Sequence, residues 1–236
     1  MSATAGPDIT TGNGDVDAGD RAAPDARAAT SMPPTARLWL VRHAAPLVAA
    51  GTCYGALNIP ADGAATYDAA QRLHAALAPV APRAQVVCST LQRCEQLAHG
   101  LKALQPDLTL QFDPRLCEMD FGAWEGQSWS TIPQREIDAW TAAFATYAPG
   151  GGEPLAAMLA RVSAALQSAR ALARRGAVTD VAWITHAGVA RCVDWLLSHG
   201  DGNGNGNGNG DSLMPLSHQW PRAAPDWGHW VVRPLA

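Results

Sequence analysis

Leu38-Trp39-Leu40-Val41-Arg42-His43-Ala44 is the stretch around which this 236-residue chain is organised. Four large apolar residues in succession indicate a strand that is buried on both faces. The strand ends abruptly in an arginine and a histidine. In open α/β sheets the ligand crevice lies outside the carboxyl ends of the strands. We therefore expect Arg42 and His43 to face a ligand rather than the core.

Strands and helices alternate along the rest of the chain. Short apolar runs predict further strands at 85–89, 108–112, 181–184 and within 220–232. Helical spacing of apolar residues predicts helices at 67–77, 91–104, 155–175 and 189–197. This alternation favours an α/β fold, a three-layer sandwich whose central sheet is mostly parallel and carries helices on both faces.

A second strand tip carries the same kind of chemistry. The run at 181–184 leads into Thr185-His186-Ala187-Gly188, and Arg93 lies near the start of the helix after the strand at 85–89. Four side chains are thus expected at one sheet edge: Arg42, His43, Arg93 and His186. Two guanidinium groups and two imidazoles match a phosphate dianion. They match a metal ion poorly, since an arginine repels a cation, so we expect neither a metal nor a cofactor.

These residue types also indicate a mechanism. A neutral imidazole whose other ring nitrogen is held by a backbone carbonyl can attack phosphorus and form a phosphohistidine. The leaving alkoxide then needs a proton from a carboxylic acid on the far side of the phosphate. Glu118, in a loop rich in aromatic and acidic residues, is the candidate. Asp120 and Glu125 are its rivals, although Asp120 would point oppositely to Glu118 in an extended loop.

Four motifs together resemble the histidine phosphatase superfamily, which has the phosphoglycerate mutase-like fold. They are Leu-Val-Arg-His-Ala (40–44), Ser-Thr-Leu-Gln-Arg-Cys (89–94), Leu-Cys-Glu-Met-Asp-Phe-Gly-Ala-Trp-Glu-Gly (116–126) and Ile-Thr-His-Ala-Gly-Val-Ala-Arg (184–191). The resemblance implies a metal-independent phosphatase in which His43 is the phosphoacceptor and Glu118 the proton donor. It also implies that the phosphate pocket contains Arg42, Arg93 and His186.

Within that superfamily, Cys53-Tyr54-Gly55 and the Gly-Gly-Glu before the long helix are similar to the alpha-ribazole phosphatase branch. The substrate is then a phosphorylated small molecule, with alpha-ribazole 5′-phosphate as a candidate. Two residues depart from the family pattern: Ala44 replaces a glycine, and a further phosphate-binding asparagine has no counterpart at 46–50. Thr52, Tyr54 or a backbone amide near Gly55 is expected to substitute for that asparagine.

Two other functions fit the same residues. A phosphoglycerate mutase-type phosphotransferase would return the phosphate to a second hydroxyl group instead of to water, using the same five side chains. A non-catalytic phosphate-binding or protein-interaction module would retain only the fold. Such relatives usually lack the nucleophile or the second histidine, whereas His43 and His186 are both present.

Composition bounds the function further. The chain is 47% hydrophobic with a net charge of −4, so nothing indicates the clustered basic excess of a nucleic-acid-binding protein. Its five cysteines include no CxxC pair, which favours reduced thiols over disulfides or a zinc site. No apolar run is long enough to span a membrane and no secretory signal begins the chain. We expect a cytoplasmic protein, and the sequence leaves its oligomeric state open.

The remaining expectations concern individual segments. Residues 1–36 are too polar to order themselves and predict a disordered tail, followed by one histidine phosphatase-like domain at 37–236. The Gly/Asn repeat at 201–211 predicts a mobile surface loop. The aromatic residues of 128–147 are suited to a lid over the crevice, although ordinary core packing is the commoner explanation. Glu153 is expected to cap the long helix, with substrate contact as the alternative.

Overall fold

Five strands form one mixed sheet in the order β3-β2-β4-β1-β5. Their bounds are Arg37–Arg42 (β1), Ala84–Cys88 (β2), Leu110–Phe112 (β3), Asp180–Thr185 (β4) and Trp230–Pro234 (β5). All neighbouring pairs are parallel except β1 with β5, which is antiparallel. The mostly parallel sheet predicted from the sequence is therefore confirmed, and its carboxyl ends share one edge.

The computed structural model describes residues 36–176, 178–200 and 214–235. The predicted disordered tail lies outside the described residues, except for Ala36. The predicted mobile loop at 201–211 lies outside them entirely. The account below concerns the unit Pro34–Ala236 within these ranges.

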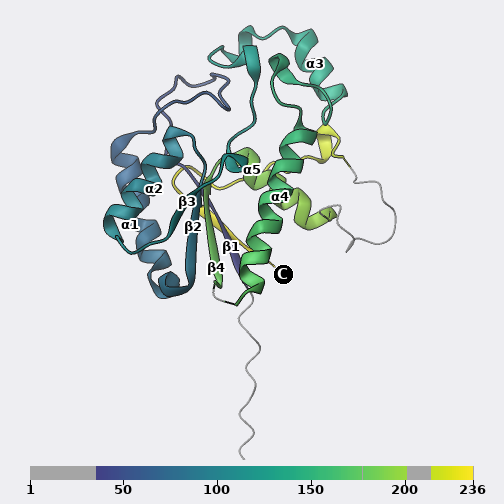
Figure 1. Cartoon of the computed structure of the whole chain (residues 1–236). Helices are drawn as coiled ribbons and strands as arrows, with labels where there is room; N and C mark the ends of the chain where they lie inside the picture. Colours follow the sequence, from purple (N-terminus) through teal and green to yellow (C-terminus); the bar gives the residue numbers. More distant parts are fainter. Residues whose placement is uncertain (1–35, 177, 201–213, 236) are drawn as a thin grey trace, which may run out of the picture. The chain divides into compact units, whose positions relative to one another are not determined.

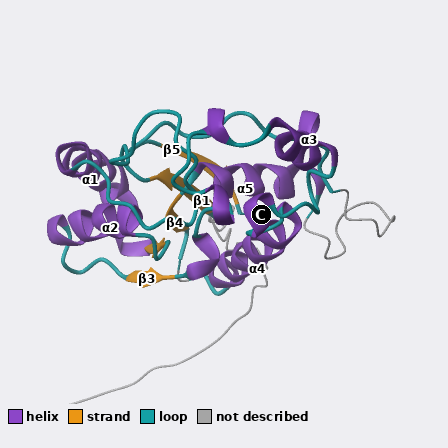
Figure 2. Cartoon of the chain, turned by 90° about the horizontal axis from the view of Figure 1, so that it is seen from above, coloured by secondary structure: helices purple, strands orange, loops and turns teal. Residues whose placement is uncertain are grey.

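Helices cover both faces of the sheet (Figure 1). The helices α1 (Gly63–Leu77) and α2 (Gln92–Leu104) pack on one face, and α4 (Leu155–Arg174) and α5 (Ala187–His199) on the other. The view from above separates the same two helical layers (Figure 2). The short helix α3 (Gln134–Ala142) lies beyond the carboxyl ends of the strands. The predicted three-layer arrangement is confirmed.

Alternation along β1 explains how one strand serves both cores. Leu38 and Leu40 belong to the cluster shared with α4 and α5, whereas Trp39 and Val41 belong to the cluster shared with α1 and α2. Successive side chains of a strand point to opposite faces, so a strand covered on both sides needs an unbroken apolar run. All four residues are buried. The run that predicted the strand thus also builds both layers of the core.

The helix α1 begins earlier than predicted. The sequence offers Thr66 as the N-cap of the predicted helix at 67–77, but the helix starts at Gly63, and the Asp62 carboxylate accepts a hydrogen bond of 2.8 Å from the Ala65 N–H group. Aspartate is among the best N-cap residues because its oxygen satisfies a free N–H group of the first turn. Asp62, and not Thr66, is therefore the local sequence signal for the start of α1.

The cap of α2 comes from elsewhere in the chain. The Ser89-Thr90 step before the predicted helix at 91–104 suggests a local cap, but this expectation is wrong, because the N-cap residue, Leu91, makes no side-chain cap bond. Instead the Gln92 N–H group donates to Asn58 Oδ1 at 2.7 Å. A cap supplied by a distant loop leaves no local sequence signal.

Other boundaries differ by a few residues. The strand β3 covers 110–112 instead of 108–112, and α5 begins at Ala187 instead of residue 189. The segment 128–147 contains only the nine-residue helix α3 and a 3-10 turn. No residue of α3 is buried, so its boundaries depend less on the core than those of the other helices.

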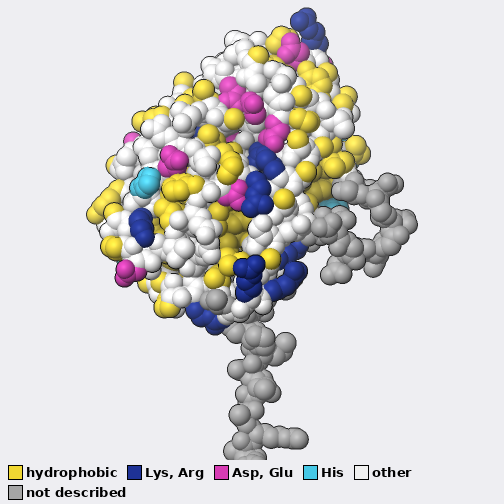
Figure 3. Space-filling view, viewed as in Figure 1, with side chains coloured by type: hydrophobic (Ala, Val, Ile, Leu, Met, Phe, Trp, Pro, Cys, Tyr) yellow, Lys and Arg dark blue, Asp and Glu magenta, His cyan; other side chains and the backbone are white. Residues whose placement is uncertain are grey.

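The described residues contain no helix with the length and apolarity needed to cross a membrane. On the face seen in Figure 3, Lys, Arg, Asp and Glu side chains are interspersed among hydrophobic and neutral ones. This pattern differs from the continuous basic stripe by which proteins follow a nucleic-acid backbone.

Removing the Asp180 carboxylate should destabilise the sheet. This buried group accepts bonds of 2.8 Å from Arg37 Nε and from Trp39 Nε1. Asp180→Ala leaves both donors unpaired, so the free energy of unfolding, measured by urea denaturation, should fall by about 3 kcal/mol. The control Asp194→Ala removes a carboxylate that is 23% exposed, compared with 2% for Asp180, and should cost less than about 1 kcal/mol. Equal losses in the two variants would contradict this account.

Candidate active site

The parallel pairing of β1 with β4 brings two histidines together. Arg42 pairs with Thr185 at the carboxyl ends of the two strands, so His43 and His186 follow in neighbouring positions. Their ring centroids are 5.1 Å apart. Both side chains are buried, with 2% and 1% of their surface exposed. The two strand tips singled out in the sequence therefore form one site.

His43 is held as a neutral imidazole. Its Nδ1 lies 2.7 Å from the Ala44 carbonyl oxygen, which can only accept, so Nδ1 carries the proton and Nε2 the lone pair. Arg93 Nε donates to Nε2 at 3.3 Å. Burial, followed by the charges of Arg93 and Arg42, lowers the pKa of His43 to about 3. A neutral ring with its lone pair on Nε2 is the form that a nucleophile needs.

Arg93 lies behind His43 rather than in the open cavity. It is completely buried and donates to the Gly55 carbonyl at 2.6 Å and to the Leu57 carbonyl at 2.8 Å. The ring of Tyr54 lies 5.5 Å from its guanidinium carbon. Arginine carries five N–H donors, so two make none of the three bonds described. Arg93 thus fixes both His43 and the loop that follows β1.

The loop after β1 also contacts the segment that carries Glu118. A Cβ atom at Gly55 would lie only 1.8 Å from the Met119 carbonyl oxygen, so this close approach requires glycine. Thr52 pairs with Ser128 in an isolated bridge. Thr52 and Tyr54 line the cavity described below, as expected for substitutes of the missing asparagine, whereas Gly55 does not.

His186 has polar partners that the sequence did not indicate. Ser89 Oγ lies 2.9 Å from His186 Nε2, within hydrogen-bond distance, and Cys94 Sγ lies 3.4 Å from the same atom. Burial, followed by the charges of Arg93 and His43, lowers the pKa of His186 well below its usual value. The sequence indicates Ser89 only as a helix cap and does not predict its contact with His186.

Arg42 is positioned by the C-terminal segment. Its Nη1 donates to the Pro225 carbonyl at 3.1 Å, and its guanidinium carbon lies 5.1 Å from the centre of the Trp227 ring. Its Nε is buried and has no hydrogen-bond partner among the described residues. Burial lowers the pKa of Arg42, which Tyr54 and Glu118 partly offset. An arginine remains charged in such a setting, and Arg42 lines the cavity described below, so it presents positive charge to an anion there.

Glu118 is the carboxyl group that faces the cavity. Its Oε2 accepts from the Gly188 N–H group at 2.9 Å, in the first turn of α5, and its Oε1 accepts from the Met119 N–H group at 3.1 Å. A Cβ atom at Gly188 would lie 2.1 Å from Glu118 Oε1. The other two candidate carboxyl groups bind backbone N–H groups elsewhere. Asp120 accepts from the N–H group of Gly122, and Glu125 accepts from the N–H groups of Ala56 and Phe121.

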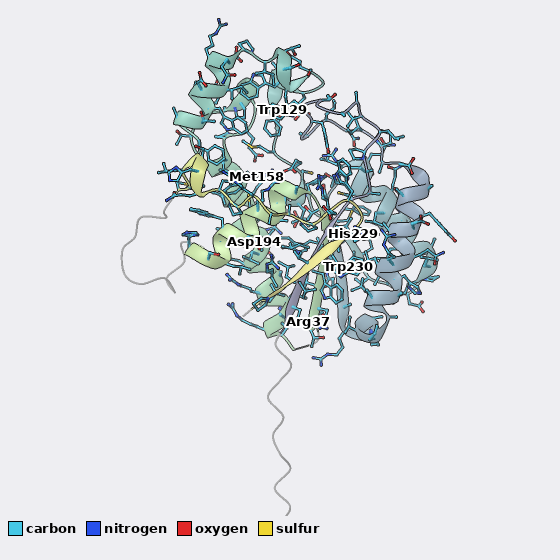
Figure 4. All side chains as sticks on the ribbon, turned by 180° about the vertical axis from the view of Figure 1, so that it is seen from behind. Arg37, Trp129, Met158, Asp194, His229 and Trp230 are labelled. Carbon is cyan, nitrogen blue, oxygen red and sulfur yellow. The ribbon has the colours of Figure 1, made fainter. Side chains whose placement is uncertain are left out.

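Arg42, His43 and Glu118 line a cavity of about 490 Å³, whereas Arg93 and His186 are not part of its lining. Its polar lining includes Arg42, His43, Thr52, Tyr54, Glu118 and Arg191. Its apolar lining comprises Met119, Phe121, Trp129, Trp140, Phe144, Leu155, Met158 and Trp220. Figure 4 shows Trp129 on the segment beyond the strand ends and Met158 on α4. Residues 128–147 therefore contribute a wall to the cavity, while Trp124 and Ile132 pack in a small core of their own.

The structure also decides the positions of Glu153 and Cys53. Glu153 does not cap α4, whose N-cap is Pro154 without a side-chain bond; it pairs instead with Arg161 at 2.7 Å. Cys53 is buried in a small core with Trp124 and is not part of the cavity lining, although its neighbours Thr52 and Tyr54 are. Among the described residues, no cluster of three or more His, Cys, Asp or Glu side chains is arranged to hold a metal ion.

A comparison with protein families identifies the chain. The model of the histidine phosphatase superfamily (branch 1) matches residues 38–204. The chain belongs to the histidine phosphatase superfamily. The resemblance carried by the four motifs is confirmed. The comparison with curated proteins gave no match.

Solved structures similar to this histidine phosphatase-superfamily member include two phosphatases. The alpha-ribazole phosphatase of Shigella flexneri is 25% identical, with a TM-score of 0.63 over 83% of this chain and 89% of the other. A mycobacterial glucosyl-3-phosphoglycerate phosphatase is 20% identical, with a TM-score of 0.64 over 84% and 89%. The protein YhfR of Bacillus stearothermophilus is 22% identical, with a TM-score of 0.65 over 83% and 89%. The latter two share the fold.

The stability of this superfamily member should depend on His43 at acid pH. The unfolded chain takes up a proton near pH 6.5, whereas native His43 takes one up only near pH 3. Stability is therefore complete above pH 6.5 and falls as the pH decreases toward 3, by up to about 1.4 kcal/mol per pH unit. Urea denaturation between pH 4.5 and 6.5 should show a shallower slope for His43→Gln, but not for His99→Gln at an exposed position. Parallel slopes for His43→Gln and the wild type would contradict this.

Proposed function

We propose that the protein is a phosphomonoesterase that acts through a phosphohistidine on His43. The observation that carries this proposal is the His43 imidazole, buried and neutral, with Nδ1 bonded to the Ala44 carbonyl. Two arginines and a carboxyl group surround it, so that one side chain can attack phosphorus while others stabilise charge and supply a proton.

The proposed reaction has two steps. In the first, the lone pair of His43 Nε2 attacks phosphorus, the ester P–O bond breaks, and Glu118 gives its proton to the leaving oxygen. In the second, water attacks the phosphohistidine and Glu118 takes a proton from the water, releasing inorganic phosphate. Arg42 and Arg93 offset the charge on the phosphoryl oxygens in both steps, and the neutral His186 ring can add a hydrogen bond.

The cavity favours a substrate with a large planar leaving group. Its apolar lining includes the rings of Trp129 and Trp140, which stack with centroids 6.3 Å apart, and those of Phe144 and Trp220. Aromatic rings of a ligand gain offset or edge contacts against such walls. Alpha-ribazole 5′-phosphate, a nucleotide with a benzimidazole base, fits this chemistry better than a small polar phosphoglycerate. The cavity thus favours the phosphatase over the mutase alternative.

The proposal also specifies partners and location. The partner is a phosphorylated small molecule, and the chemistry described requires neither a metal nor a nucleic acid.

We propose the cytoplasm as the location, because all five cysteines are free thiols, which suits a reducing compartment. The non-catalytic alternative is disfavoured because His43 and Glu118 line one cavity and His186 lies beside His43, with ring centroids 5.1 Å apart.

Removing the nucleophile should abolish hydrolysis. His43→Ala is expected to lower kcat for p-nitrophenyl phosphate by about a thousandfold or more, because no other group occupies the position of Nε2. Rapid quenching of the wild type should trap acid-labile, base-stable phosphate on residue 43. His99→Gln, at an exposed position distant in sequence, serves as the control and should retain full activity. Retained hydrolysis in His43→Ala would exclude the mechanism.

Shortening an aromatic wall should affect large substrates selectively. Trp140→Ala is expected to lower kcat/KM for alpha-ribazole 5′-phosphate about tenfold, equal to about 1.4 kcal/mol, through lost ring contacts. The kcat/KM for 3-phosphoglycerate should change less than about twofold. Trp140→Phe, which keeps a ring, should restore most of the difference. The test is a steady-state comparison of both substrates, and an equal effect on the two would refute the assignment of this wall to the leaving group.

A further inference from the structure

Every N–H donor of the Arg161 side chain, on α4, is used. Nε and Nη2 donate to the two carboxylate oxygens of Glu153, each at 2.7 Å. Nη1 donates to the carbonyls of Arg115 and Cys117 at 2.8 and 2.7 Å, and Nη2 donates to the carbonyl of Glu118 at 3.2 Å. A planar guanidinium group can make this set of bonds because its five donors have a fixed geometry.

The acceptors converge on the segment that carries Glu118. This segment lies between two 3-10 turns and belongs to no strand or α-helix, and it runs beside α4 (Figure 1). The Glu153 N–H group also donates to the Asp120 carbonyl at 2.7 Å. The backbone is therefore tied on both sides of Glu118 by the pair formed from Glu153 and Arg161. No ligand of the cavity is needed for any of these bonds.

The anchor of this arrangement is rigid. The helix α4 has 20 residues, and its buried face packs in the cluster shared with β1, β4 and α5. The pair itself is only one-fifth exposed, at 20% for Arg161 and 18% for Glu153. Burial alone would lower the pKa of Arg161, but the hydrogen bonds and charge of Glu153 raise it, so Arg161 remains charged.

We propose that Arg161, oriented by Glu153, is a positioning residue that holds Glu118 at the distance from which it protonates the leaving group. The inference rests on the proposed function, because it concerns the same reaction. Arg161 is outside the cavity lining and touches no substrate atom. It acts through the backbone carbonyls of residues 117 and 118, which set the direction of the Glu118 side chain. General acid catalysis is sensitive to such placement, because the proton must be within hydrogen-bond reach.

The test compares two esters that differ in their need for a proton. p-Nitrophenolate leaves without protonation, whereas the alkoxide of an alkyl phosphate such as ethyl phosphate requires it. For Arg161→Met, kcat/KM should fall at least about tenfold more for ethyl phosphate than for p-nitrophenyl phosphate. This ratio reports the step in which the leaving group departs. Loss of fold stability alone would lower both values equally.

Three further variants separate positioning from general damage. Arg161→Lys keeps the positive charge but not the planar guanidinium group with its five donors. It should therefore show most of the selective loss of kcat/KM for ethyl phosphate. Arg233→Met is the matched control, since Arg233 also pairs with a carboxylate through two bonds, of 2.7 and 3.1 Å, far along the chain from Glu118. It should leave the ratio of the two kcat/KM values unchanged. Glu153→Gln keeps the size of the partner and should give an intermediate selective loss, which keeps the test usable if Arg161→Met does not fold.

A double variant tests whether the effect passes through Glu118. In a Glu118→Gln background, Arg161→Met should reduce kcat/KM for ethyl phosphate less than about twofold further, because the group that it positions is already absent. Equal losses on both esters, or independent losses in the double variant, overturn the inference and leave the proposed function intact. If the wild type hydrolyses neither of the two esters, the proposed function itself is overturned.

Discussion

The parallel pairing of β1 with β4 is the constraint on which the site depends. The backbone ladder continues past the strands: the His43 N–H group donates to the Thr185 carbonyl at 3.1 Å, and the Ser89 N–H group donates to the Ile184 carbonyl at 2.9 Å. Three strand tips are thereby locked to one another before any side chain contributes. Because the tips belong to a sheet buried on both faces, the two imidazoles inherit the rigidity of the core.

The electrostatics of the site follow from this burial. Desolvation keeps both imidazoles uncharged, so the positive charge comes from arginines, which do not lose their protons. A phosphate dianion would act in the opposite direction and raise the pKa of each histidine. The site thus combines a fixed positive field with a neutral nucleophile, two properties that a pair of protonated imidazoles could not provide together.

Arginine side chains also fasten irregular segments to the regular frame. Arg93 holds the loop after β1 through two carbonyls, Arg42 holds the C-terminal segment through Pro225, and Arg161 holds the segment of Glu118. In each case the acceptors are backbone carbonyls that no strand or helix uses. The irregular segments carry the proton donor and much of the cavity lining, so these attachments define the site as much as the residues that face it.

The sequence by itself determined the layers of the fold and the membership of the site. Apolar runs and helical periodicity are local, and they predicted the strands, the helices and the tips that carry Arg42, His43 and His186. Only the tertiary structure decided which groups these side chains contact, such as Ser89 beside His186 and Asn58 at the start of α2. Those partners are backbone carbonyls or single polar residues from distant segments, and neither leaves a periodic pattern in the sequence. The physical reason is that such contacts form only after the core has brought the segments together.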